Sequence, residues 1–92
     1  MQVPAELKLK YLNRRIQDIQ KLRLSLENDD YSLAMKLGHQ VKGNATTFDF
    51  PQIAFLGVEI EQAARKKDKN VVQALVMRME TAIQSAQENF QG

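Results

Sequence analysis

The chain has 92 residues, of which 43% are hydrophobic and 26% are charged, and its 13 basic and 11 acidic side chains leave a formal net charge of +2. A chain of this length predicts one domain over residues 1–92, with no room for a second, nucleotide-dependent catalytic domain. The small basic excess disfavours nucleic acid as a partner, and the longest uncharged stretch, nine residues from Phe50 to Val58, is well short of the roughly 20 that a membrane-spanning helix needs.

The first residues of the chain lack the features of a secretory leader. Met1 to Glu6 contain neither a basic region nor an apolar one, and no cysteine occurs in the sequence. We therefore expect a cytoplasmic protein without a disulfide, a thiolate metal site or a cysteine nucleophile.

Apolar residues at steps of three and four predict the first two helices. The first helix, over about residues 5–27, carries a stripe from Leu9 to Leu26 that only Arg23 interrupts. The side chain of Arg23 is expected to extend outward to solvent. Asn28 to Asp30 form a turn and cap signal, and the second helix follows over about residues 30–46.

Two more helices are predicted in the second half of the chain. The third helix carries an apolar stripe from Ile53 through Gly57 to Ala64. Asp49, two residues before Pro51, is expected to cap this helix, which ends in the basic run from Arg65 to Lys67, as suits a helix C-terminus. A fourth apolar stripe runs from Val72 to Phe90. Four helices with short connections predict an all-α fold, an antiparallel four-helix bundle with up-down-up-down topology.

The single histidine, His39, lies inside the second predicted helix. A helix turns about 100° per residue, so His39 lies about 200° from Leu37, almost opposite the middle of the apolar stripe. Lys42 shares the face of His39, and Gly43, one turn later, leaves that flank of the ring without a side chain. A glycine inside a helix costs up to about 1 kcal/mol relative to alanine, so Gly38 and Gly43 indicate close approach by another group.

An exposed imidazole beside a cation, with no side chain at the position one turn later, is suited to carry a phosphoryl group. Neutral Nε2 can attack without the help of a general base, and the ammonium of Lys42 offsets the charge that arrives. The alternative is that His39 is an ordinary solvated surface histidine. No glycine-rich phosphate loop occurs, so an independent enzyme is not expected, and one histidine without cysteine disfavours a metal site.

A longer pattern surrounds His39. The motif H-x-[VL]-K-G spans His39–Gly43, with Leu33–Gly38 before it and with Phe48 and Leu56–Glu61 after it. In this pattern the chain resembles a histidine-containing phosphotransfer (Hpt) domain over essentially its whole length. The resemblance implies a four-helix bundle whose histidine accepts a phosphoryl group on Nε2 from the aspartyl phosphate of a receiver domain, and passes it to another receiver.

The resemblance also implies roles for individual residues. His39 would be the phosphoacceptor, Lys42 its charge partner and Gly43 the residue that keeps the ring accessible. The third helix of such domains contributes a polar residue beside the imidazole, often glutamine, and the matching position here is Glu61. A carboxylate there accepts a hydrogen bond from Nδ1–H but repels an incoming phosphoryl group. Arg65 either adds a second positive charge near the site or pairs with Glu61.

The expected partners are response-regulator receiver domains and, with them, a hybrid histidine kinase. The chain is expected to be a monomer that holds no cofactor of its own, while the receiver supplies Mg²⁺. Helical geometry places Met35, Phe55 and Val58 on the outer faces of the second and third helices, which predicts an apolar docking patch near His39. The alternative function is a helical docking module that binds a signalling partner without phosphoryl chemistry.

Overall fold

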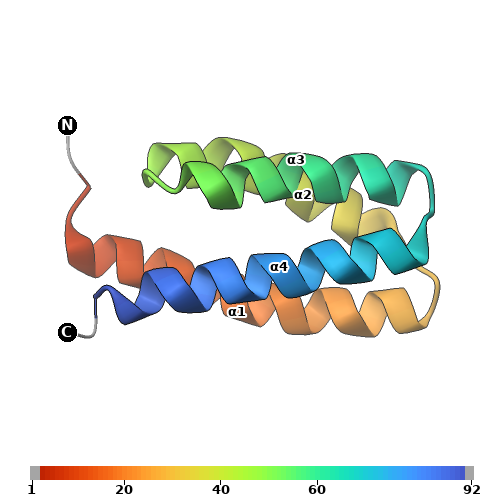
Figure 1. The fold of residues 1–92 in the computed structure, drawn as a ribbon, viewed down its shortest axis with the longest axis horizontal. Coiled ribbons are helices and arrows are strands. Elements are labelled where there is room, and N and C mark those ends of the chain that lie inside the picture. Colours follow the sequence, from red (N-terminus) through yellow and green to blue (C-terminus); the bar gives the residue numbers. More distant parts are fainter. Residues whose placement is uncertain (1–2, 91–92) are drawn as a thin grey trace.

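The computed structural model describes residues 3–90 and has four helices in that range. The helices are α1 (Ala5–Glu27), α2 (Ser32–Thr47), α3 (Pro51–Arg65) and α4 (Lys69–Glu88). The chain runs along the bundle four times in alternating directions (Figure 1), which confirms the predicted all-α, up-down-up-down bundle. Within the described range, no helix combines the length and the apolar composition that crossing a membrane requires.

The helices pack as two pairs around one core. α2 and α3 make the most extensive contact, and α1 contacts α4 far more than it contacts α2; Figure 1 shows α1 beside α4 and α2 beside α3. None of the fully buried side chains of α2 is larger than valine, whereas the other helices also bury leucine, isoleucine or methionine. The largest fully buried side chains are Leu12, Ile19, Leu22, Leu26, Ile60, Val72, Val76 and Ile83. Because α2 lacks bulk on its buried side, it can lie close to α3.

Three connections begin at a residue with left-handed backbone geometry. Asp29, Asp49 and Lys67 follow α1, α2 and α3 with φ angles of 56°, 66° and 54°. The N–H groups of Asp49 and Phe50 donate to carbonyl oxygens in the last turn of α2, so Asp49 closes α2. The predicted capping of α3 by Asp49 is wrong, because α3 begins after Phe50 without a side-chain cap.

Asp30 determines where α2 begins. Its carboxylate accepts hydrogen bonds from the backbone N–H of Ser32 at 3.0 Å and from the Ser32 hydroxyl at 2.6 Å. Asp30 therefore belongs to the turn, and α2 starts at Ser32, slightly later than the predicted start near residue 30. The observed bounds of α1 agree with the predicted ones.

Aromatic side chains hold the C-terminal end of α2 against α1. The ring of Tyr11 stacks on Phe48 with 4.5 Å between centroids, and its hydroxyl donates a hydrogen bond to Asn44. Phe50 and Phe90 continue this cluster with an edge-to-face contact at 6.5 Å. α2 is therefore anchored at this end by α1 as well as by α3.

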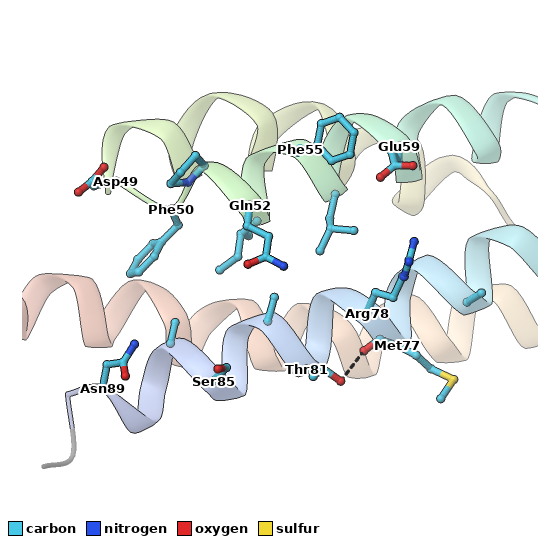
Figure 2. Close-up of a pocket in the computed structure, with 16 residues that line it drawn as sticks. Asp49, Phe50, Gln52, Phe55, Glu59, Met77, Arg78, Thr81, Ser85 and Asn89 are labelled. Carbon is cyan, nitrogen blue, oxygen red and sulfur yellow. Dashed lines mark hydrogen bonds between the residues drawn. The ribbon is translucent and has the colours of Figure 1, made fainter.

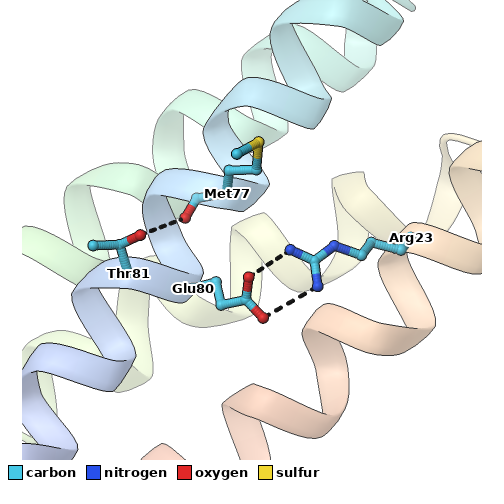
Figure 3. A network of polar contacts seen from close by, with 4 residues as sticks. All are labelled: Arg23, Met77, Glu80 and Thr81. Carbon is cyan, nitrogen blue, oxygen red and sulfur yellow. Dashed lines mark hydrogen bonds and ion pairs between the residues drawn. The ribbon is translucent and has the colours of Figure 1, made fainter.

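An ion pair joins α1 to α4 at the surface. Two guanidinium nitrogens of Arg23 donate to the two carboxylate oxygens of Glu80 at 3.1 and 2.5 Å (Figure 3). Arg23 thus reaches outward, as its place in the apolar stripe of α1 predicted. Partly exposed pairs of this kind contribute about 0–1 kcal/mol, so core packing is the main force that holds α1 against α4.

Candidate functional site

His39 lies in the middle of α2, and its side chain is 71% exposed. The residues through which α2 packs on the bundle lie on the other side of the helix: Ala34, Gly38, Val41 and Ala45. The prediction that the imidazole points to solvent is therefore confirmed.

A carboxylate from the neighbouring helix lies beside the imidazole. Nδ1 of His39 is 3.4 Å from Oε2 of Glu61 on α3. Arg65, one turn later on α3, donates a hydrogen bond from Nη2 to the same oxygen at 3.0 Å. The side chain of Glu61 is only 13% exposed, so the carboxylate lies between the ring and the guanidinium. Of the two alternatives for Arg65, the structure shows pairing with Glu61.

These contacts favour the charged form of the carboxylate. The hydrogen bond from Arg65, followed by the attraction of His39, holds the pKa of Glu61 below its ordinary value despite the opposing effect of desolvation. An ionised carboxylate accepts a hydrogen bond from Nδ1–H, which favours the tautomer with a free electron pair on Nε2. The carboxylate beside Nδ1 therefore favours a ring whose unprotonated nitrogen is Nε2.

Lys42 and Gly43 leave the surface next to His39 open and positively charged. Both residues are exposed, and Lys42 makes no ion pair within residues 3–90. A Cβ atom built on Gly43 would meet no heavy atom within 4 Å. Packing in the bundle therefore does not explain the glycine at position 43, and its role in access stays a prediction.

Gly38 has the opposite surroundings. A Cβ atom at this position would lie 2.6 Å from the carbonyl oxygen of Gly57 and 2.8 Å from the backbone nitrogen of Glu61. The predicted close approach is confirmed for Gly38, and the approaching group is the backbone of α3. The sequence pattern placed Gly57 only in the apolar stripe of the third helix. A second glycine inside a neighbouring helix was the signal for this contact.

The predicted patch of Met35, Phe55 and Val58 is not assembled around His39. Met35 is half-buried and packs against the core, so the prediction that it points outward is wrong. Val58 is half-buried on α3, one turn before Glu61. Phe55 is 63% exposed, as predicted, but it lies about 120° around α3 from Glu61. Helical arithmetic gives directions about one axis and does not show which neighbouring helix covers a side chain.

Phe55 instead lines a groove between α3 and α4 (Figure 2). Met77 lines the α4 side of this groove and is 64% exposed, and Thr81 donates a hydrogen bond to the Met77 carbonyl oxygen at 3.2 Å. The groove contains no imidazole, so it is distinct from the surface around His39. In the part of the chain that the structure describes, no three His, Cys, Asp or Glu side chains are grouped so that they could hold a metal ion.

Comparison with protein-family models identifies the family of the chain. A family model described as Hpt domain matches residues 7–89, a range that contains His39, Glu61 and nearly all of the four helices. Searches of curated proteins and of solved structures gave no match.

Proposed function

The chain belongs to the Hpt domain family, whose members are phosphocarrier modules of two-component signalling, and we propose that His39 is the residue that carries the phosphoryl group. The proposed reaction is phosphoryl exchange between Nε2 of His39 and the aspartate of a receiver domain. One observation carries the proposal: an exposed imidazole whose Nδ1 lies 3.4 Å from the carboxylate of Glu61.

The proposed reaction needs only groups at the surface of α2 and α3. Neutral Nε2 attacks the phosphorus of the aspartyl phosphate, the N–P bond forms while the P–O bond to the aspartyl carbonyl breaks, and the aspartate leaves as a carboxylate. Nδ1 keeps its proton, and Glu61 stabilises the positive charge that the ring acquires. The reverse reaction uses the same groups, so the chain can accept or donate the phosphoryl group.

Positive side chains offset the charge at this site. The carboxylate of Glu61 alone would repel a phosphoryl group, but the guanidinium of Arg65 is bound to it at 3.0 Å. Lys42 adds an exposed ammonium on α2, three residues after His39. The Mg²⁺ that offsets charge on the phosphoryl oxygens is proposed to come with the receiver.

We further propose that the receiver covers the surface where α2 and α3 meet. Its aspartyl phosphate must come within bonding distance of His39, and Val58 lies beside this surface, one turn before Glu61. Val58→Asp should therefore weaken receiver binding, whereas Phe55→Asp, on the face towards α4, is the matched control. Equal binding by the two variants would contradict this placement. A receiver joined to a hybrid histidine kinase is one such partner, which implies a cytoplasmic location.

Incubation with a phosphorylated receiver and Mg²⁺ tests the assignment of His39. The wild-type chain should gain acid-labile, alkali-stable phosphate as the receiver loses it. His39→Gln should gain none while its helical circular dichroism stays unchanged, because the side chain is exposed. Acid-labile label on that variant would contradict the assignment. Receiver binding without label on the wild-type chain would instead favour a docking module without phosphoryl chemistry.

A further inference from the structure

We propose that Gly38 and Gly57 are positioning residues whose backbone contact sets the separation of His39 from Glu61. Through that separation they control which nitrogen of the ring is protonated. The expected change in transfer rate rests on the proposed function, whereas the expected change in the protonation of the His39 ring does not.

The contact between the two glycines is reciprocal. A Cβ atom on Gly38 would lie 2.6 Å from the carbonyl oxygen of Gly57 and 2.8 Å from the backbone nitrogen of Glu61. A Cβ atom on Gly57 would lie 2.9 Å from the carbonyl oxygen of Gly38 and 3.1 Å from the backbone nitrogen of Lys42. Cβ atoms in proteins essentially never lie within 3.0 Å of such atoms. A methyl group at either position would therefore force α2 and α3 to shift.

This contact lies at the same level of the bundle as the proposed site. On α2 it involves the turn from Gly38 to Lys42, which contains His39, and on α3 it involves the turn from Gly57 to Glu61. A change in helix spacing here changes the distance from Nδ1 to the Glu61 carboxylate. That distance of 3.4 Å is already longer than the roughly 2.7–3.2 Å typical of N–H···O hydrogen bonds. Further separation would lose the contact.

The surroundings of α2 near Gly38 are compatible with a small shift. α2 contacts α1 far less than it contacts α3, and its aromatic contact with α1 through Tyr11 and Phe48 lies at the C-terminal end of α2. A small displacement near Gly38 therefore leaves that contact in place. We expect Gly38→Ala to fold with a wider spacing between α2 and α3, so that its effect can be measured at the site.

Gly38→Ala and Gly43→Ala form a matched pair for the test. Both substitutions add one methyl group to α2, but at Gly43 the methyl group meets no atom within 4 Å. Nitrogen-15 NMR of the imidazole should show mainly Nδ1–H in the wild type and in Gly43→Ala. Gly38→Ala should lose this preference in favour of Nε2–H. Its transfer rate from a phosphorylated receiver should fall about tenfold to a hundredfold, the size expected for a displacement near 1 Å.

Several outcomes would overturn the positioning role. One such outcome is that Gly38→Ala keeps the wild-type protonation of the His39 ring and the wild-type transfer rate, whether or not its stability falls. The glycines would then serve helix packing alone. If Gly38→Ala does not fold, Gly57→Ala repeats the test with a milder closest contact of 2.9 Å. Failure of both to fold would make the pair a requirement of the fold and overturn the proposal. Failure of the proposed function is distinguishable, since the wild type would then take no phosphate while the NMR comparison still applies.

Discussion

The two sides of α2 contain the same residue type in opposite surroundings. On the packed side, the backbone of α3 approaches Gly38 so closely that no side chain fits. On the open side, Gly43 has empty space around it and lies beside the exposed His39 and Lys42. The packed side therefore limits how close the two helices lie, while the open side is available to a partner. Variants on the packed side should therefore change stability or helix spacing and affect transfer only through that spacing, whereas variants on the open side should change transfer directly.

The largest expected effect comes from the core that the packed side of α2 faces. Ile60, next to Glu61 on α3, is 1% exposed, and Ile60→Ala leaves a cavity in the core. We expect the free energy of unfolding, measured with urea, to fall by about 2–5 kcal/mol. The fraction that remains folded should still transfer phosphate, because the exposed groups are unchanged. A stability loss well below this range would show that the core around Ile60 collapses to fill the space.

On the open side, Lys42→Ala should slow transfer without changing stability. A hydrogen bond to a charged group contributes about 1.5–3 kcal/mol, which corresponds to roughly a tenfold to hundredfold change in rate. The rate constant should be measured at low salt, since salt screens exposed charges. Lys36→Ala, another exposed lysine on α2, is the control. An unchanged rate would mean that Lys42 contributes only to the solubility of the helix surface and not to transfer.

Gly43→Gln should separate stability from access. Glutamine is a better helix former than glycine, and the open surroundings of Gly43 accept it, so stability should rise by up to about 1 kcal/mol. The longer side chain should at the same time obstruct the receiver and slow transfer. Thermal unfolding and the transfer rate test the two effects separately. Lower stability together with normal transfer would make Gly43 a packing residue.

The smallest expected effect is on the pKa of Glu61, whose carboxylate on α3 lies beside His39 of α2. Arg65 is the main cause of the lowered pKa of Glu61, so Arg65→Ala should raise that pKa towards its ordinary value. Because the pKa is lowered in the folded state, the stabilisation by this pairing is present at neutral pH. It is lost as the pH falls through the lowered pKa; Arg65→Ala lacks this pairing, so its Glu61 should become protonated at higher pH. Carbon-13 NMR titration of the Glu61 carboxyl measures the shift, with Lys66→Ala as control; a midpoint that stays or falls would contradict it.

Features that depend on a single helix were predictable from the sequence. The four apolar stripes predicted the helices, and the position of His39 about 200° from Leu37 predicted its exposure, because a regular helix fixes the direction of every side chain about its own axis. Lys42 and Gly43 followed from the same geometry. The local bonding of Asp49 was not predictable in this way, since the same residue type suits both a helix N-cap and a left-handed turn.

Features that depend on two helices could not be predicted from the sequence. Its periodicity was enough to predict four amphipathic helices and an exposed histidine with a lysine on its face. Helix packing was needed to show that Gly38 meets Gly57, that Glu61 lies 3.4 Å from Nδ1, and that Phe55 lines the groove towards α4. Each of these depends on the rotation and spacing of neighbouring helices, which packing contacts along the whole bundle set together, and no local periodicity encodes them.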